Sequence, residues 1–177
     1  MKHISIFFLT LALFSSCNTR EGGECTIKGV IASEDKRDSC YVFLVPQGPH
    51  EASEVDSTLI TNGTFEFTVE KERMAIVRVT KYRRFGLQDL LVVTEPGKVS
   101  VEIGESSIGG GTVQNDSLQV WKQLTERYNL SARNAASEEE RIALREAYKQ
   151  RTRSMAAALG HESTLGSFLN GLYPEAN

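Results

Sequence analysis

Apart from His3, the histidines that can ligate a metal are His50 and His161, each followed directly by a glutamate. A zinc site needs three or four ligands that converge, and helical zinc motifs repeat histidine one turn further on. Neither His-Glu pair has a second histidine at that spacing. We therefore expect two surface loop residues, with no metal and no cofactor bound.

Asp56-Ser57 and the glycine run 109–112 contain residue types that are used in hydrolysis and in phosphate binding. A serine nucleophile needs a positioned base, but alternation along a strand places Asp56 and Ser57 on opposite faces. A P-loop ends in Gly-Lys-Ser/Thr, which is missing after the glycine run. We expect an ordinary strand at 56–57, a flexible joint between sheet and helices at 109–112, and no enzymatic activity.

Cys17 stands directly after an apolar run. A short basic start, the run 4–14 and small residues at Ser15 and Ser16 are typical of a secretory signal peptide. The run is shorter than the about 20 residues that a membrane span needs. We therefore expect residues 1–16 to be removed on export.

The four residues Phe14-Ser15-Ser16-Cys17 resemble the lipobox of bacterial lipoproteins, in which the cysteine sulfur receives a diacylglyceryl group. Several acyl chains on one residue make a stable membrane anchor. We expect lipidation of Cys17 and a flexible tether over residues 17–24. The localisation predicted is the cell envelope of a Gram-negative bacterium, at the periplasmic or the surface face of the outer membrane. An ordinary signal peptide with an incidental cysteine is the alternative.

Basic and aromatic residues gather in the stretch RVTKYRRFG. They are Arg78, Lys81, Tyr82, Arg83, Arg84 and Phe85. This pattern is typical of nucleic-acid binding, but export removes nucleic acid as a partner. We expect a basic hairpin tip that discourages pairing between sheet edges. A surface patch for an anionic glycan or a lipid headgroup is the alternative.

Cys25 and Cys40 remain after lipidation, in an oxidising compartment where a disulfide can form. If residues 25–32 and 40–46 formed one hairpin, the two cysteines would lie too far apart along the strands for a bridge. Other strand orders can bring them together. We expect two buried free thiols, with a disulfide as the alternative, and the absence of Cys-x-x-Cys excludes thioredoxin-type chemistry by this chain itself.

The composition is that of a globular domain, with 40% hydrophobic and 24% charged residues and a net charge of −3. The mildly acidic balance argues against general affinity for nucleic acid. From residue 25 to 104, seven short segments alternate apolar and polar residues and are separated by turn residues. Asn62-Gly63 predicts a two-residue type I′ hairpin turn. These patterns favour an antiparallel β-sandwich of about seven strands.

Helical periodicity replaces the alternation over residues 112–173. Asn115 or Asp116 is expected to cap a first helix. Ser137 with Glu140 predicts the start of a second helix, and Gly160 its end. A short third helix is expected near 164–172. The fold class predicted is therefore α+β, mainly β with two or three carboxyl-terminal helices packed on or following the sandwich.

The order of these features resembles a known family. The stretches CTIKGV, VDSTLITNGTFEF, LLVVTEPGKVSVEI and GGTVQNDSLQVW are similar to the amino-terminal domain of unknown function of envelope lipoproteins that continue into a thioredoxin-like domain for thiol-disulfide interchange. In that family the catalytic cysteines lie in the thioredoxin domain, whereas this sequence stops where that domain would begin. The resemblance therefore implies a β-sandwich with trailing helices and supplies no active-site residue.

The function predicted from these observations is that of a non-enzymatic binding or assembly module, anchored to a membrane through Cys17. Its partners are the membrane and another envelope protein, such as a thiol oxidoreductase. The alternative is the amino-terminal half of a thioredoxin-like oxidoreductase, either truncated or encoded apart from its second half.

Overall fold

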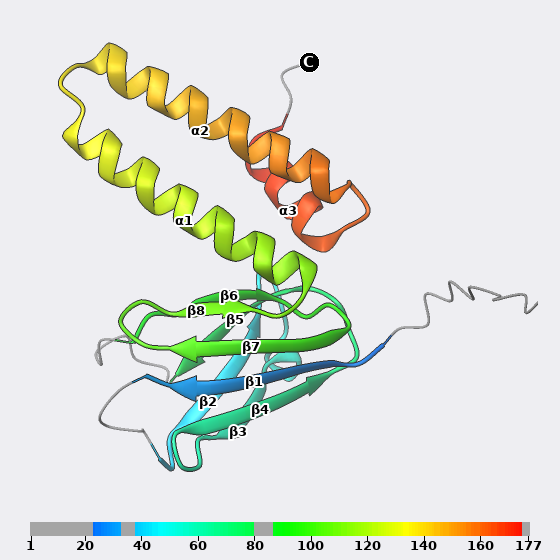
Figure 1. The fold of residues 1–177 in the computed structure, drawn as a ribbon. Helices are drawn as coiled ribbons and strands as arrows, with labels where there is room; N and C mark the ends of the chain where they lie inside the picture. Colours follow the sequence, from blue (N-terminus) through cyan, green and yellow to red (C-terminus); the bar gives the residue numbers. More distant parts are fainter. Residues whose placement is uncertain (1–22, 33–37, 80–86, 175–177) are drawn as a thin grey trace, which may run out of the picture.

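A computed structural model describes residues 23–32, 38–79 and 87–174. The described chain forms two four-stranded sheets followed by three helices (Figure 1). In order across the sheets, the strands of the first sheet are β4 (Thr64–Val69), β1 (Cys25–Ile31), β7 (Gly97–Ile103) and β8 (Ile108–Gly110). Those of the second are β3 (Asp56–Leu59), β2 (Tyr41–Pro46), β5 (Met74–Val79) and β6 (Leu90–Val93). The α+β sandwich predicted from the sequence is confirmed.

Side-chain alternation builds the core between the two sheets. In β1, β4 and β7 every second side chain is buried, as their two-residue period predicted. β2 lies between β3 and β5, and Val42, Leu44 and Pro46 on its inner face are buried. Its outer face carries Phe43 and Val45, so the strand is apolar on both sides, as expected for a central strand.

The pairing of β1 with β7 departs from the antiparallel pattern that we expected. These two strands run parallel in register, from Cys25 opposite Gly97 to Ile31 opposite Ile103. β6 ends at the same end of the sandwich where β1 begins, and only three residues connect it to β7. β7 therefore enters the first sheet beside the start of β1 and runs in the same direction.

The type I′ turn is confirmed at Asn62-Gly63, where both backbone φ angles are positive, +53° and +72°. Thr61 and Thr64 exchange backbone hydrogen bonds of 2.9 and 3.0 Å across it. The strands on either side then diverge, because β3 joins the second sheet and β4 the first. The predicted hairpin is therefore limited to the turn and the bridge between Thr61 and Thr64, and the turn links the two sheets.

The glycine run 109–112 is not the flexible joint that the sequence suggested. Gly109 and Gly110 belong to β8, which pairs with β7 and is the eighth strand, and Gly111 follows with φ +103°. A Cβ atom on Gly111 would lie 2.6 Å from the carbonyl oxygen of Lys98. The glycines are therefore needed for a close fit between β8, β7 and the helix that follows.

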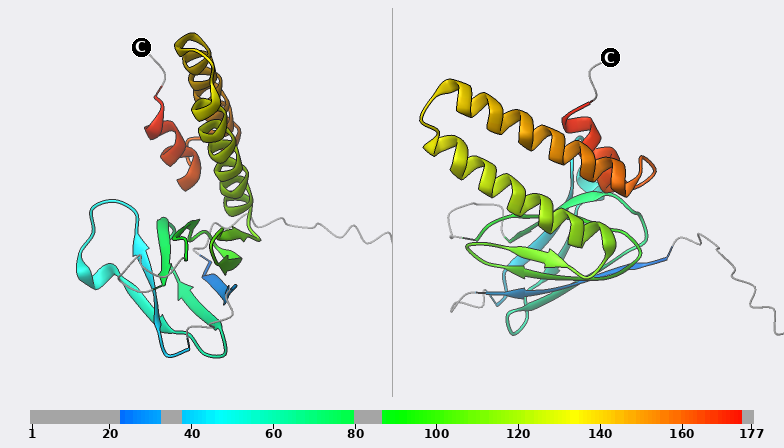
Figure 2. Two further views of the ribbon diagram at one scale, coloured as in Figure 1. Left: turned by 90° about the vertical axis from the view of Figure 1, so that its left-hand side faces the viewer. Right: turned by 45° about the horizontal axis from the view of Figure 1, so that its top comes forward.

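Three helices follow the sandwich: α1 (Val113–Asn134), α2 (Glu138–Leu159) and α3 (Thr164–Leu172). Figures 1 and 2 show α1 and α2 as an antiparallel hairpin that stands away from the sheets, with α3 beside the near end of α2. None of the described helices combines the length and hydropathy that a membrane span requires.

The ends of α2 and α3 match the sequence more closely than the start of α1. Ser137 accepts a hydrogen bond from the Glu140 N–H, and Gly160 follows α2 with a positive φ, as predicted. The expectation that Asn115 or Asp116 caps α1 is wrong, because Thr112 holds the cap position. Glu95, in the loop between β6 and β7, instead accepts hydrogen bonds from backbone N–H groups in the first turn of α1.

The helices are joined to the sandwich by a second apolar cluster, which comprises Met74, Val93, Leu118, Ala156, Leu165 and Leu169. At its edge, the buried side chain of Asn115 pairs with the outer edge of β6, the last strand of the second sheet. Its Oδ1 accepts from the Val93 N–H at 2.9 Å, and its Nδ2 donates to the Val93 carbonyl oxygen at 2.8 Å. The helical segment is thus fixed to the second sheet by both apolar contact and a strand-like pair of hydrogen bonds.

Candidate binding groove

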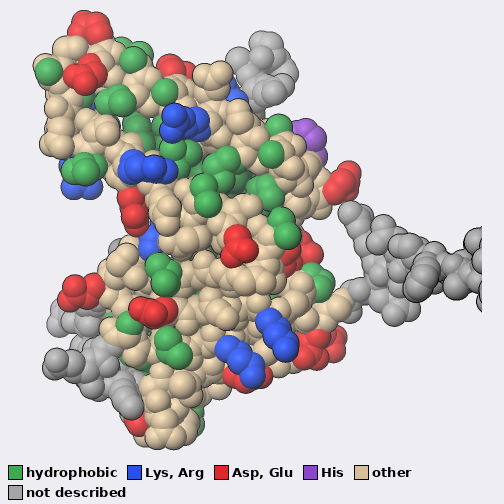
Figure 3. Space-filling view, viewed as in Figure 1, with side chains coloured by type: hydrophobic (Ala, Val, Ile, Leu, Met, Phe, Trp, Pro, Cys, Tyr) green, Lys and Arg blue, Asp and Glu red, His purple; other side chains and the backbone are tan. Residues whose placement is uncertain are grey.

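A groove of about 1020 Å³ lies on the outer face of the first sheet, below α1. Figure 3 shows this face of the molecule. The lining comes from strands of both sheets and from α1. It comprises Lys28, Gly29, Val30, Leu59, Thr61, Thr64, Phe65, Glu66, Ser100, Val101, Glu102, Ile108, Gly109, Gly110, Gln119 and Gln123.

The groove follows from small side chains on the outer face of the sheet and larger ones around it. The small residues on β4, β7 and β8 are Thr64, Ser100 and Gly110. Their small size leaves a depression in the surface. Gln119 of α1 stands beside β8, and its Oε1 accepts a hydrogen bond from the Gly109 N–H at 3.3 Å. The helix therefore forms one wall of the groove and the sheet its floor.

The polar groups of the groove are mostly uncharged. Among the described residues, the side chains of Thr61, Ser100 and Gln123 have no hydrogen-bond partner, so each can bind a ligand. Lys28 and Glu66 form an ion pair of 3.3 Å, but both side chains are more than half exposed, and such pairs contribute little. The groove therefore offers amide and hydroxyl groups to an occupant rather than a concentrated charge.

Apolar side chains complete the lining. Val30, Leu59 and Ile108 are 45%, 47% and 46% exposed, and they come from three different strands. Such exposure is ordinary for a single apolar residue. Three such side chains around one groove, however, add apolar contact area beside the hydrogen-bonding groups of the groove. This combination suits binding of a ligand that has both polar and apolar parts.

Of the described residues singled out from the sequence, Gly109 and Gly110 line this groove, whereas Cys25, Cys40 and Arg78 do not. Cys17, Lys81, Tyr82, Arg83 and Arg84 lie outside the described residues.

Arg78 lies on β5 in the other sheet, where it is half-buried. Its Nη2 and Nε lie 2.7 and 2.8 Å from Oδ2 of Asp89. This guanidinium is therefore paired across the sheet.

The two described cysteines are free and lie at opposite ends of the sandwich. Cys25 begins β1, whereas the Cys40 carbonyl accepts from the Ile60 N–H, near the end of β1 where Ile31 donates to Gly63. β1 is about 20 Å long, far beyond the reach of a disulfide. The expectation of free thiols is confirmed, although Cys40 is only half-buried. β1 and β2 do not form one hairpin, since they belong to different sheets.

Cys25 is expected to make stability fall at alkaline pH. Burial of its thiol, with smaller effects from Glu95 and Glu72, raises its pKa from 9.0 to about 11. The unfolded chain then loses the proton first, so the contribution of this group is complete below pH 9 and declines up to about pH 11. The slope is about 1.4 kcal/mol per pH unit.

Urea unfolding of the full chain and of Cys25→Ala, each measured on both sides of pH 9, tests this expectation. The stability advantage of the wild-type chain over Cys25→Ala should shrink as pH rises. Cys40→Ala controls for loss of a thiol elsewhere. An advantage that stays constant with pH would contradict the assignment to Cys25.

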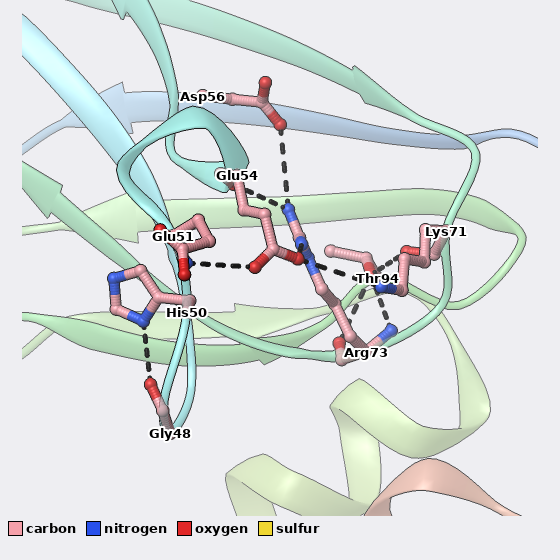
Figure 4. A network of polar contacts seen from close by, with 8 residues as sticks. All are labelled: Gly48, His50, Glu51, Glu54, Asp56, Lys71, Arg73 and Thr94. Carbon is pink, nitrogen blue, oxygen red and sulfur yellow. Dashed lines mark hydrogen bonds and ion pairs between the residues drawn. The ribbon is translucent and has the colours of Figure 1, made fainter.

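A polar cluster fixes the loop before β3 to β5 (Figure 4). Arg73 donates to the Glu54 carbonyl oxygen at 3.0 Å and lies 3.5 Å from the Glu54 carboxylate and 4.0 Å from that of Asp56. The Thr94 hydroxyl accepts from the Arg73 N–H and donates to the Lys71 carbonyl oxygen. These contacts join three loops, and sequence analysis missed them because their residues are far apart in the chain.

His50 and His161 are both exposed, as expected for surface loop residues. His50 precedes the short 3₁₀ helix η1 (Ala52–Glu54), and its Nδ1 lies 2.7 Å from the Gly48 carbonyl oxygen. Among the described residues, His, Cys, Asp and Glu side chains form no group of three that could hold a metal ion. Asp56 and Ser57 lie on β3, as the sequence indicated.

Comparison with known proteins identifies one family. Residues 25–118 match the family described as a domain of unknown function (DUF4369). This range covers the whole sandwich and the start of α1, and so includes all the sheet residues of the groove. No curated protein and no solved structure matches the chain.

Proposed function

The chain belongs to the DUF4369 family, a domain of unknown function, and with that as premise we propose that it is a lipid-anchored envelope protein whose sandwich and helices form a non-enzymatic binding module. The groove on the first sheet is the observation that carries the binding role. The residues around Cys17 are the support for anchoring.

Anchoring is supported by the order of residues before the first strand. An apolar run, two serines and Cys17 are followed by a short polar stretch that reaches β1 at Cys25. Eight residues span at most about 27 Å. A lipid on Cys17 would therefore hold the sandwich close to a bilayer, in the envelope of a Gram-negative bacterium and at its outer membrane.

Labelling of cells with a radioactive fatty acid tests the anchor. We expect label on the wild-type protein and complete loss of label in Cys17→Ala. That variant should also leave the membrane fraction, from which detergent extracts the wild-type protein. Cys25→Ala is the matched control, because it removes a buried thiol and should keep its label. An unlabelled wild-type protein, or label that survives in Cys17→Ala, would refute the proposal.

The binding role is tested by filling the groove. Ser100→Arg places a long side chain on its floor, whereas Thr68→Arg makes the same change on an exposed position of β4 that does not line the groove. We expect one envelope component to co-purify with the wild-type protein and with Thr68→Arg, and to be reduced at least about ten-fold with Ser100→Arg. Equal recovery with both variants would contradict a role for the groove.

A second candidate is that this domain works with a thioredoxin-like thiol-disulfide oxidoreductase. The sequence resemblance favours it, and the buried Cys25 and half-buried Cys40 at opposite ends mean that such a partnership would take its reactive cysteines from elsewhere. The DNA that follows the Asn177 codon distinguishes the possibilities. An in-frame Cys-x-x-Cys would favour one polypeptide, and a thiol oxidoreductase recovered with the tagged protein would favour two.

A further inference from the structure

A second groove lies between α1 and α2 and has a volume of about 260 Å³. Arg127 of α1 and Arg151 of α2 both line it. Its remaining lining is apolar or hydroxyl-bearing and contains no carboxylate. On the face shown in Figure 3, Lys and Arg side chains gather over this helical hairpin. Two cations therefore line one small hollow from facing helices.

Several other basic residues of α1 and α2 have partners. Lys122 lies 3.8 Å from Glu126, Lys149 lies 2.9 Å from Glu146, and Arg153 donates to the carbonyl oxygens of Tyr173 and Pro174.

Arg127 and Arg151 form no ion pair or side-chain hydrogen bond with any described residue. Neither has an acidic residue three or four positions away on its own helix. Neither charge is therefore balanced by an ion pair within the described residues.

We propose that this groove binds a phosphate monoester between Arg127 and Arg151. A guanidinium presents a planar fork of donors that matches phosphate oxygens, and two forks can hold one phosphate from both sides. A phosphate monoester carries about −1.5 to −2 charges at neutral pH, which balances two guanidinium groups, whereas a carboxylate balances only one.

The side chains on the floor of the groove indicate which organic group the phosphate ester carries. Leu124, Leu144 and Ala147 supply apolar contacts, and the rings of Tyr128 and Tyr148 stack at 4.6 Å with an angle of 13°. A water takes up about 30 Å³ of liquid, so the groove has the volume of about nine waters. That volume accommodates a phosphate with a small aromatic or alkyl group.

The tyrosine stack is held in place by other contacts, so the groove is formed before a ligand arrives. The hydroxyl of buried Tyr148 lies 2.8 Å from the Thr125 hydroxyl, and its ring packs edge-on against Tyr173. Because these contacts lie behind the groove, substitution of the two exposed arginines should leave the fold intact.

Isothermal titration of the full chain in neutral detergent with phenyl phosphate tests the proposal. We expect binding that weakens with added salt, about ten-fold weaker binding in Arg127→Gln or Arg151→Gln, and about hundred-fold weaker binding in the double variant. Inorganic phosphate should bind more weakly than phenyl phosphate, because it lacks the ring that contacts the floor.

The double variant Arg133→Gln/Arg145→Gln is the matched control, since it removes the same charge from the same two helices outside the groove. An equal loss in this control, or no binding by the wild-type chain, would overturn the site. Phosphatidic acid, a lipid whose headgroup is itself a phosphate monoester, is added to the detergent to identify the source of the phosphate. Competition that depends on Arg127 and Arg151 supports the site with a lipid headgroup as its ligand, and binding without competition supports it with a soluble phosphate monoester.

Discussion

Replacement of Gly29 by alanine is expected to lower the free energy of unfolding by about 3–5 kcal/mol, the range observed when a core phenylalanine is lost. Gly29 lies opposite Phe65 in the pairing of β1 with β4, and the Phe65 ring covers it. A Cβ atom on Gly29 would lie 2.0 to 2.3 Å from three atoms of that ring. Since Phe65 is only 5% exposed, its ring must leave the core to make room.

Urea unfolding followed by circular dichroism measures this effect, and a double-mutant cycle with Phe65 assigns it. In a Phe65→Ala background the obstacle is gone, so Gly29→Ala should cost less than about 1 kcal/mol. Gly171→Ala is the matched control, because a Cβ atom there meets open space within α3 and alanine favours helix. A large loss for Gly29→Ala that persists without the Phe65 ring would show that the reason given is wrong.

The sequence predicted those parts of the fold that depend on near neighbours. The alternation in β4, the positive φ angles at Asn62-Gly63 and the start of α2 at Ser137 each involve residues within a few positions of one another. Which sheet a strand joins depends on partners far along the chain. The parallel pairing of β1 with β7 and the separation of β3 from β4 were therefore missed.

The glycine run and the start of α1 show a second limit. Gly109 and Gly110 have no side chains to alternate, and β8 is three residues long, so its pattern is too short to predict a strand. Asn115 has the side chain of a helix cap, and propensity alone placed it there. The sheet edge at Val93, 22 positions away, uses the same side chain instead.

Most of the candidate site was also beyond local reasoning. The signal around Cys17 is contiguous in the chain, so it can be recognised from the sequence, and lipidation there stays a prediction. The groove could not be recognised in this way, since Val30, Leu59, Ile108 and Gln123 come together only through the packing of four elements. One signal was present in the sequence, because Gln119 and Gln123 are one helical turn apart and so share a face of α1. That these two side chains lie over a sheet could not be predicted without knowing the fold.

Replacement of Asn115 by alanine is expected to lower the free energy of unfolding by about 2–6 kcal/mol and to loosen the helices from the sandwich. The Asn115 side chain is 2% exposed and satisfies both the N–H and the carbonyl group of Val93. Alanine leaves these two buried groups without partners, at about 1–3 kcal/mol each. Leucine would fail in the same way, since it supplies neither a donor nor an acceptor.

Fluorescence of Trp121 reports on the junction, because this single tryptophan lies on α1 and packs edge-on against Phe168 of α3. In Asn115→Ala we expect the fluorescence transition to move to lower urea than the transition of the sheets, and the Val93 amide to exchange its hydrogen faster. Asn129→Ala, an exposed position on the same helix, should be neutral or slightly stabilising. Coincident transitions with an unchanged midpoint would mean that apolar contact alone, through Met74, Leu118 and Leu165, holds the helices on the sheet.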